Sequence, residues 1–429
     1  MTIYIESYVD FLWTYMTIPV LIFVSIYMTL YYHGVQFRFT NMLRVATTKS
    51  NNTGEISAFQ SLTMALAARV GVGSLAGIGL ALYIGGPGSL FWMWVCALLT
   101  AAASFAESTL AQMFKRRDKN IFVGGPAYYI ESGIGSKRFG ILYAVVIILT
   151  YTFGFTAIQS NTIATSFADV LQLNHITTGI LLALLTGLII YGGTETIAKT
   201  SSKIVPFMAI AYVLLGIYVI FTNLDYVPVF FTTIFQDAFG FSQISGGTLG
   251  AIIATGFKRS VFCSEAGMGS GAHAAATTNS KNPTDQGYIQ ALGVYITMFL
   301  ISTITAFLIM VTDATSIANS SSNGIEITQY ALTSLFGELG GYFLTIAIFF
   351  FAFSTILTGY FYGESNIKYL FNNDKYLNVV RFLTILTIII SAIASPSLLW
   401  SLVDLGVGIT AIINVIAIFL LAKKVKKYI

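Results

Sequence analysis

The chain has 429 residues, of which 56% are hydrophobic and only 9% are charged. This composition excludes a soluble globular domain and indicates an integral membrane protein. The formal net charge of +4 gives no indication of nucleic-acid binding, and the two cysteines, Cys96 and Cys263, fall inside apolar segments, which argues against a disulfide framework.

Segments long enough to cross a bilayer follow one another along the whole chain, and no soluble domain separates them. A membrane span needs roughly 20 apolar residues, and this length predicts about 11 transmembrane helices. The first apolar run has no basic residue before it and no small-residue cleavage site, so we expect a span and not a signal peptide. The predicted spans are centred near Leu21, Arg69, Ala97, Leu149, Leu184, Tyr212, Ser264, Leu300, Phe350, Thr387 and Ala411.

The basic residues between these spans fall on alternate connections, for example in "KRRDK" at 115–119 and in the tail "KKVKK". The intervening connections carry aspartate and glutamate but no lysine or arginine. Because cytoplasmic loops are enriched in lysine and arginine, this pattern predicts a multi-pass protein of the plasma membrane. With an odd number of spans, the amino terminus lies outside and the carboxyl terminus lies in the cytoplasm.

The second predicted span contains the sequence "AARVGVGSLAG" at 67–77. Each glycine weakens a helix by about 1 kcal/mol relative to alanine, and non-helical backbone at membrane depth persists only beside protein or a water-filled cavity. The pattern Gly-x-Gly-Ser occurs at 71–74 and again at 267–270, once in each half of the chain. Paired interrupted spans are typical of secondary transporters with an internal repeat. Close helix packing is the alternative, since Gly73 and Gly77 also form a G-x-x-x-G pattern.

An interrupted helix has a definite chemistry at membrane depth. Its bared N–H groups and the positive end of the half-helix dipole attract a carboxylate, while its freed carbonyl groups suit a small cation. We therefore predict that a substrate binds at Gly71, Gly73, Ser74, Gly267, Gly269 and Ser270, and that a cation binds at Ala68, Val70 and Ser74.

Four stretches together carry a family resemblance: "FQSLTMALAARVGVGSLAGIGLALYIGGPGSLFWMWV", "GGPAYYIESG", "KRSVFCSEAGMGS" and "FAFSTILTGYFYGE". The chain resembles the alanine or glycine:cation symporter family. The resemblance implies an all-α membrane protein of the leucine-transporter fold, with 11 spans and two broken helices. It also implies symport of a small neutral amino acid with a cation, which we take to be sodium. We expect a first helix and connection at 1–50, inverted five-helix repeats at 51–225 and 226–422, and a basic cytoplasmic tail at 423–429.

Further site residues follow from the resemblance alone. Gln159 and Asn161 align with a polar segment that lines the family's pocket, although hydrogen bonding between helices explains them equally well. Ser354 and Thr355 match a pair proposed to contact the cation, or they bond to their own helix. Thr297 stands where the family commonly has aspartate, and Gly359 stands where it has tryptophan near the pocket.

The largest departure from the family is Arg69, which replaces a threonine in the first interrupted helix. A charged residue at mid-membrane costs about 2.5 to 3.5 kcal/mol, so Arg69 needs a partner inside the bundle. Our hypothesis is that it takes the place of a bound ion, opposite the substrate carboxylate or a protein carboxylate. The alternative is a structural role, in which Arg69 caps exposed carbonyl groups or pairs permanently with Glu107 or Glu265. The expected charge network comprises Arg69 with Glu107, Lys258, Arg259, Glu265 and Asp404.

Other functions fit the sequence less well. Ser270 and His273 are three residues apart, but no third group that would orient a base is evident, so we predict no enzymatic activity. A channel normally needs repeated filter segments. A sodium-independent carrier, coupled to protons or working as a uniporter or exchanger with Arg69 as its fixed charge, stays open as the alternative. The sequence predicts no cofactor and no metal other than sodium as the coupling ion, and it leaves the oligomeric state open.

Overall fold

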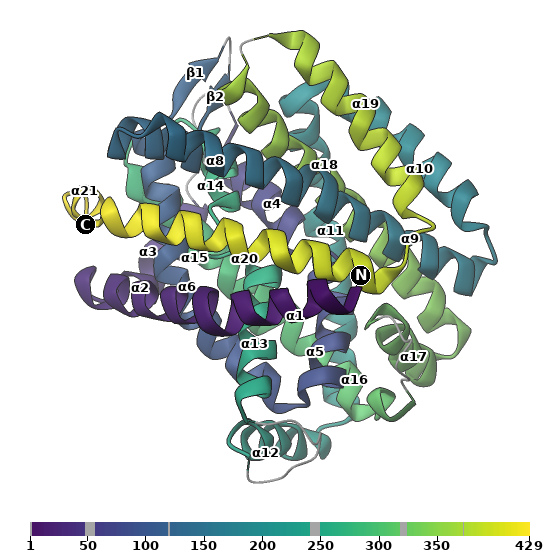
Figure 1. Cartoon of the computed structure of the whole chain (residues 1–429). Helices are drawn as coiled ribbons and strands as arrows, with labels where there is room; N and C mark the ends of the chain where they lie inside the picture. The colour runs from purple at the N-terminus through teal and green to yellow at the C-terminus, as the bar shows by residue number, and fades with distance from the viewer. Residues whose placement is uncertain (1, 48–55, 119–120, 241–248, 318–323, 372) are drawn as a thin grey trace.

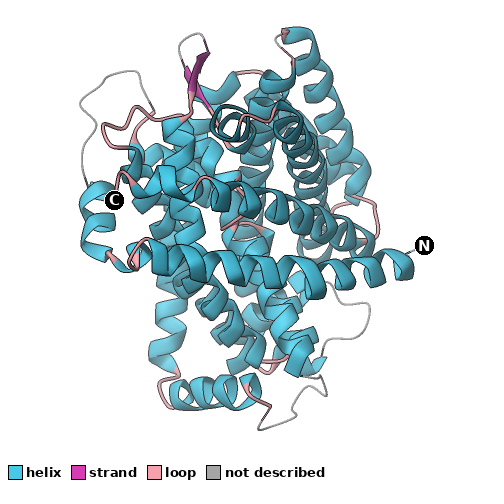
Figure 2. Cartoon of the chain, turned by 60° about the vertical axis from the view of Figure 1, so that its left-hand side comes forward, coloured by secondary structure: helices cyan, strands magenta, loops and turns pink. Residues whose placement is uncertain are grey.

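The computed structural model describes residues 2–47, 56–118, 121–240, 249–317, 324–371 and 373–429, and these are almost entirely helical (Figure 2). The helices are α1 (Thr2–Leu12), α2 (Ile18–Tyr31), α3 (Phe39–Thr47), α4 (Ala58–Arg69), α5 (Ile78–Gly85), α6 (Gly88–Met113), α7 (Pro126–Tyr129), α8 (Lys137–Ile147), α9 (Thr156–Leu171), α10 (His175–Ile190), α11 (Gly193–Thr222), α12 (Tyr226–Ala238), α13 (Leu249–Ser264), α14 (Ser270–Ala276), α15 (Pro283–Tyr295), α16 (Thr303–Val311), α17 (Gly324–Phe336), α18 (Glu338–Leu370), α19 (Asp374–Ser391), α20 (Pro396–Leu420) and α21 (Ala422–Lys426).

Several consecutive helices are joined without a turn by π-helical segments. Trp13–Thr17 joins α1 to α2, Ile148–Phe155 joins α8 to α9, and Ile296–Ser302 joins α15 to α16. Further π-helical segments lie at Gly73–Gly77 and Ile130–Ile134, and short 3₁₀ turns lie at Val35–Phe37 and Ala314–Ile317. Two short antiparallel strands, β1 (Arg116–Asp118) and β2 (Ile121–Val123), form a hairpin in which Arg117 faces Phe122.

Seven helical segments of the described chain are long and apolar enough to cross a membrane, and the bent pair α4 and Gly73–Gly85 adds an eighth. Three further segments predicted from the sequence are helical but fall short of that standard. Helices α10 and α13 have 16 residues each, and α19 carries Asp374, Lys375 and Arg381 within its 18 residues. The structure is therefore that of a multi-pass helical membrane protein, with fewer segments that qualify by length and composition than the 11 predicted.

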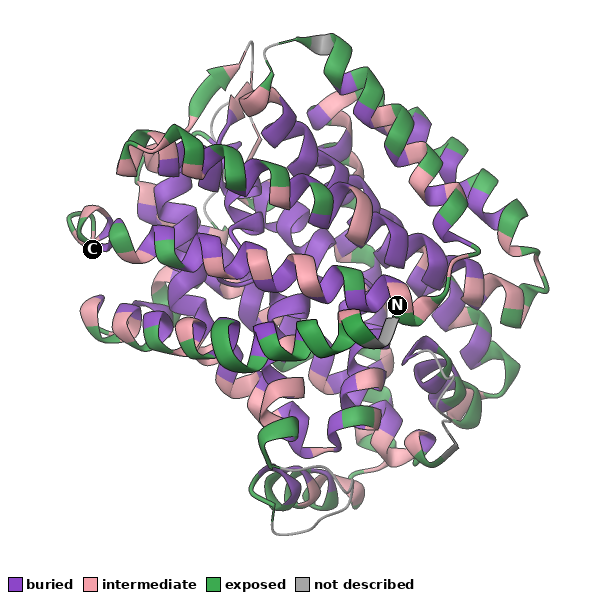
Figure 3. Cartoon of the chain, viewed as in Figure 1, coloured by how far each residue is buried: buried purple, intermediate pink, exposed green. Residues whose placement is uncertain are grey.

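The helices pack around α6 and α18, whose residues are mostly buried (Figure 3). Helix α20 lies between α8 on one side and α1 with α2 on the other, while α10 and α19 lie side by side at the edge of the bundle (Figure 1). Large apolar side chains on the outer helices are exposed, among them Leu188, Phe207 and Phe382. An apolar outer surface around a buried polar interior is what a lipid environment requires.

Helix α17 packs against Gly73–Gly85, the second half of the first interrupted helix, with no side chain between the two backbones at Gly79 and Gly324. A Cβ atom on Gly79 would collide with the carbonyl oxygen of Gly324, and one on Gly324 would collide with that of Ala76. The hydroxyl of Thr328 donates to the carbonyl oxygen of Leu75 at 3.1 Å. The two glycines are therefore required here for close approach.

Candidate substrate and cation site

The first interruption lies between α4 and the π-helical segment that continues it. Helix α4 begins with a capping box, in which the Ser57 hydroxyl accepts from the Gln60 N–H and the Gln60 side chain accepts from the Ser57 N–H. The helix stops at Arg69, where Val70 has φ −91° and ψ 62°, and it resumes at Gly73 with its axis bent by 51°. The predicted break in this span is therefore present.

Two side chains from other helices hold the backbone of this first break. The bared N–H of Val72 donates to Gln159 Oε1 on α9 at 3.1 Å. The hydroxyl of Thr355 on α18 donates to the carbonyl oxygen of Ala67 at 2.7 Å. The Ser74 hydroxyl donates to the carbonyl oxygen of Arg69 at 3.0 Å. Polar groups freed by the break thus find partners within the bundle, as burial demands.

The glycines of the first break provide space and not unusual backbone angles. A Cβ on Gly71 would collide with the hydroxyl of Thr355, and one on Gly73 would lie 2.8 Å from the ring of Phe262. Neither glycine has a positive φ. The space beside each glycine is occupied by a side chain from another helix, which contacts the backbone directly.

The second interruption runs from Glu265 to Gly269, between α13 and α14. Three of its residues have positive φ: Glu265 at 55°, Gly267 at 87° and Gly269 at 80°. Left-handed backbone is accessible to glycine but costs other residues about 1 to 2 kcal/mol. The second Gly-x-Gly-Ser copy therefore forms a true unwinding of the chain, with a non-glycine residue, Glu265, held in that conformation.

Two buried carboxylates hold the start of α14. Glu107 Oε2 on α6 accepts from the Gly269 N–H at 3.0 Å and from Asn414 Nδ2 at 2.8 Å. Asn414 Nδ2 also donates to the Gly267 carbonyl oxygen at 2.9 Å, and Tyr129 donates its hydroxyl proton to Asn414 Oδ1. Glu265 Oε2 accepts from the Ser270 hydroxyl at 2.8 Å. Both carboxyl groups thus accept hydrogen bonds at the amino-terminal end of α14.

Arg69 connects the two interruptions. It is 1% exposed, and its Nη1 donates to the carbonyl oxygen of Gln290 at 2.9 Å. A Cβ on Gly271, in the first turn of α14, would lie 2.7 Å from Nη2. No ion pair between Arg69 and a carboxylate occurs in the described part of the chain. The guanidinium thus contacts a carbonyl group within α15, while Glu107 and Glu265 contact the two residues before Gly271.

The other predicted residues lie in two groups. Ser354 and Thr297 donate to carbonyl oxygens of their own helices, those of Phe351 at 2.8 Å and Gly293 at 3.0 Å. Asn161 donates to the carbonyl oxygens of Ser391 and Ala394, so it faces the end of α19 and not Val72.

Gly359, on α18, packs against the backbone of the segment between α8 and α9. A Cβ at this position would lie 3.2 Å from the carbonyl oxygen of Tyr151. The buried Ala68 and Val70 flank Arg69 at the end of α4.

Part of the expected charge network lies apart from the breaks. Arg259 Nη2 forms a buried ion pair with Asp404 Oδ2 at 2.6 Å, and its guanidinium lies 4.5 Å from the ring centre of Trp400. Lys258 pairs with Asp10 at 2.9 Å. The structure thus separates Lys258, Arg259 and Asp404 from Glu107, Glu265 and Arg69.

Sequence reasoning did not single out several residues that contact the breaks. Ser104, Gln290 and Asn414 each bond to Arg69 or to the second break, and Phe262 fills the space beside Gly73. Ser104 and Glu107 are three residues apart and so share one face of α6. That shared face was a signal available in the sequence, whereas the partners of Gln290 and Asn414 depend on tertiary packing.

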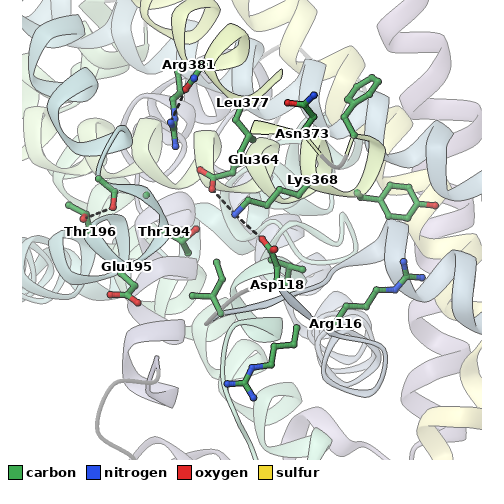
Figure 4. Close-up of a pocket in the computed structure, with 18 of the residues that line it drawn as sticks. Arg116, Asp118, Thr194, Glu195, Thr196, Glu364, Lys368, Asn373, Leu377 and Arg381 are labelled. Atoms are coloured by element: carbon green, nitrogen blue, oxygen red, sulfur yellow. Dashed lines mark hydrogen bonds and ion pairs between the residues drawn. The ribbon is translucent and has the colours of Figure 1, made fainter. Parts of the chain in front are cut away.

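A separate cavity of about 870 Å³ opens between the hairpin, the start of α11 and the adjoining ends of α18 and α19 (Figure 4). Lys368 lies at its centre and pairs with Glu364 Oε1 at 2.9 Å and with Asp118 Oδ2 at 3.4 Å. Lys368 is 13 residues beyond Thr355 on α18, a distance of roughly 20 Å along a helix. The cavity is therefore distinct from the breaks but lies along the same helix.

No group of three or more His, Cys, Asp or Glu residues that could hold a metal ion is found among the described residues. The breaks present carbonyl, hydroxyl and amide oxygens together with the carboxyl groups of Glu107 and Glu265. Such oxygen ligands are those that hard cations prefer.

Comparison with known proteins agrees with this architecture. The sequence profile described as the sodium:alanine symporter family matches residues 1–429. The "Amino-acid carrier protein AlsT" of Bacillus subtilis is 40% identical over 414 residues, covering 96% of this chain and 88% of that protein. The "Probable sodium/glutamine symporter GlnT" of Bacillus subtilis is 41% identical over 421 residues, covering 97% and 87%.

A solved structure resembles the fold. The crystal structure of MhsT in complex with L-phenylalanine, a protein of the leucine-transporter fold, superposes with a TM-score of 0.59. The match covers 82% of this chain and 87% of that one at 11% sequence identity. At this identity the likeness concerns the fold alone.

Proposed function

The chain belongs to the sodium:alanine symporter family, and we propose that it carries a small neutral amino acid, of the alanine or glycine kind, across the cell membrane together with sodium. The matched relatives are named as an amino-acid carrier and a symporter, which supports transport and not an enzymatic activity. The observation that carries the proposal is the meeting of two interrupted helices at the contact of Arg69 with the start of α14.

The substrate binds between the two breaks. Its carboxylate accepts from backbone N–H groups of Gly71, Gly73 and Ser74, beside the positive end of the continuing half-helix. Gln159, which contacts Val72, lies on the same side of the substrate as these N–H groups. The opposite side is formed by the unwound residues Gly267 and Gly269, with Ser270 at the start of α14. The ammonium group is directed toward freed carbonyl oxygens.

The coupling sodium binds at the cytoplasmic half of the first break. Its ligands are the carbonyl groups of Ala68 and Val70 with the hydroxyls of Ser354 and Thr355. The bond between Thr355 and the Ala67 carbonyl supports this assignment, because it brings a hydroxyl of α18 against the end of α4. Ser74 and Thr297, in place of the family's asparagine and aspartate, make weaker oxygen ligands, so we expect a modest sodium affinity.

The substrate path has a definite direction in this topology. Eleven spans, with the amino terminus outside and the carboxyl terminus in the cytoplasm, form two inverted five-helix units at 51–225 and 226–422. Arg116, Lys199, Lys368 and Arg381 then all lie on the cytoplasmic side, where they line the cavity at the end of α18 (Figure 4). That cavity is the cytoplasmic mouth of the transport path.

Uptake into proteoliposomes tests the proposal. Purified protein is reconstituted and given labelled alanine, glycine, serine or glutamine, with inward gradients of sodium, of protons, or of neither. Alanine or glycine should accumulate under the sodium gradient. If alanine, glycine and serine all fail to accumulate or exchange under either gradient, the assignment of the substrate class is wrong. Accumulation that follows only the proton gradient would replace sodium with the proton as the coupling ion.

A further inference from the structure

The guanidinium of Arg69 occupies a narrow slot formed by residues of three helices. Nη1 donates to the Gln290 carbonyl oxygen on α15 at 2.9 Å, and Nη2 lies 3.4 Å from the Ser104 hydroxyl on α6. Two glycines form the remaining walls. A Cβ on Gly271 would lie 2.7 Å from Nη2, and one on Gly293 would collide with Nη1. The space that the guanidinium fills thus exists because these two positions lack side chains.

The surroundings of the slot are rich in buried oxygen atoms that have no hydrogen-bond partner. Glu107 Oε1, Glu265 Oε1 and Gln290 Oε1 are all of this kind, and their residues are fully buried. Gln290 Oε1 lies at the slot itself, 3.3 Å from the position of a Cβ on Gly271. The other two carboxylates hold the neighbouring residues Gly269 and Ser270. Unpaired buried acceptors indicate that a positive charge or a donor belongs among them.

The donor types of the slot suit a monovalent metal cation. A peptide carbonyl, a serine hydroxyl and an amide oxygen, with carboxylates one step further out, form an oxygen set of the kind that holds sodium beside unwound helices. Arg69 brings its own permanent charge into that set. Its Nε has no hydrogen-bond partner, so the guanidinium satisfies the slot only in part as a hydrogen-bond donor.

We propose that Arg69 is a resident cation, and that its guanidinium fills a buried site which would otherwise bind a sodium ion. The inference rests on the proposed function, since it concerns the number of ions coupled to each substrate. The chain then transports its amino acid with one cation fewer than a version of itself that lacks this side chain. Sodium still binds at the site beside Thr355.

Sodium titration of the purified protein in detergent tests the number of sodium sites without any transport step. Wild type, Arg69→Ala and Arg69→Thr are titrated with sodium in a choline background, and the response is followed by tryptophan fluorescence and by the unfolding temperature. Equilibrium dialysis with labelled sodium, run beside these titrations, should show about one more bound ion per protein at saturation in both variants than in wild type, because a second site has been opened. Arg138→Gln, which removes an exposed positive charge at the start of α8, is the matched control and should titrate like wild type.

A structural role as a carbonyl cap gives a different result. In that case both variants unfold at lower temperature, bind the same number of sodium ions as wild type, and regain no stability at high sodium. That outcome overturns the proposal. If Arg69→Ala does not fold, Arg69→Thr decides, since it restores the residue that the family typically has at this position.

The glycines of the slot give an independent test. Gly293→Ala in wild type should displace the guanidinium and lower the unfolding temperature. In the Arg69→Ala background the same change should have little effect on stability but should block the extra sodium site. Equal destabilisation in both backgrounds would show that Gly293 does not accommodate Arg69, and would contradict the slot as described.

These measurements separate failure of the inference from failure of the proposed function. If wild type transports no amino acid in proteoliposomes but the number of bound sodium ions still rises in the Arg69 variants, the proposal of a resident cation stands and the proposed substrate class is wrong. If transport is normal and the number of bound sodium ions does not change in the variants, only the proposal of a resident cation is wrong.

Discussion

The two interrupted helices share the pattern Gly-x-Gly-Ser but use their glycines in opposite ways. In the first, Gly71 and Gly73 have ordinary backbone angles, and no side chain fits at either position because Thr355 and Phe262 lie against the backbone there. In the second, Gly267 and Gly269 have positive φ and the chain is truly unwound. One short motif therefore supports two structures, a sharp bend of 51° and a five-residue open segment.

The difference shows what stabilises each break. The first is held by neutral groups, the amide of Gln159 and the hydroxyl of Thr355. The second is held by carboxylates, Glu107 and Glu265, around the start of a short helix. The first break therefore depends on close contact and the second on hydrogen bonds to carboxyl groups, and substitutions at the two should fail in different ways.

Filling the space at the first break should have the largest effect. We expect Gly71→Ala to abolish amino-acid uptake, because its Cβ would collide with Thr355 Oγ1 and lie 3.0 Å from Gln159 Oε1. The measurement is alanine uptake in proteoliposomes at matched protein content. Gly250→Ala, at an exposed helical position with nothing within 4 Å of the new Cβ, is the control and should transport like wild type. Normal uptake by Gly71→Ala would show that this close contact is not required.

Removing the Glu107 carboxyl group at the second break should chiefly affect stability. Glu107→Ala leaves the Gly269 N–H without its acceptor and leaves Asn414 Nδ2 with the Gly267 carbonyl oxygen alone, at a cost of about 1 to 3 kcal/mol for the buried Gly269 N–H. The unfolding temperature in detergent should fall clearly. The exposed Arg116–Glu131 pair offers the control, since Glu131→Ala should cost about 0 to 1 kcal/mol. An equal effect of the two substitutions would contradict a structural role for Glu107 at this break.

Replacing Gln159, the neutral partner at the first break, should have an intermediate effect on substrate affinity. Gln159→Leu deprives the Val72 N–H of its acceptor, and a loss near 1.4 kcal/mol would weaken the apparent substrate affinity about tenfold. Asn161→Leu serves for comparison, because its amide contacts α19 instead. That variant should lower the unfolding temperature more than it lowers the affinity. Concentration-dependent uptake measures the first quantity, and thermal unfolding measures the second.

The smallest effect is expected at Gly267. Gly267→Ala forces alanine into left-handed backbone, which costs about 1 to 2 kcal/mol, and places its Cβ 3.0 Å from the side chain of Leu21. A small fall in unfolding temperature with partial uptake would fit a strained but intact break. Wild-type stability in this variant would mean that the segment adopts other backbone angles.

The sequence predicted the features that depend on local composition. Apolar length located the long spans, and the clustered glycines located both interruptions. It could not predict the two uses of glycine, because that difference depends on whether Thr355 or Phe262, from helices far along the chain, lies against the backbone. The sequence could not predict the partner of Arg69 either. Its contact with Gln290 joins residues 221 positions apart, and no local pattern favours a carbonyl group over the carboxylates of Glu107 and Glu265.

The count of spans shows a second limit of local reasoning. Helices α10 and α13 are too short, and α19 too charged near its start, to qualify alone. Each is nevertheless helical and packed against the bundle, α10 against α19 and α13 against α6.

The contact between α17 and the first interrupted helix has a mechanical consequence. Gly79 and Gly324 meet backbone to backbone, so no side chain between them can change rotamer to let the two helices slide. We expect the Gly73–Gly85 half of the bent helix and α17 to move together, because their backbones are in direct contact. A fluorescent label on the exposed Tyr330 position of α17 would then report, from the protein surface, the state of a bend buried deep in the bundle.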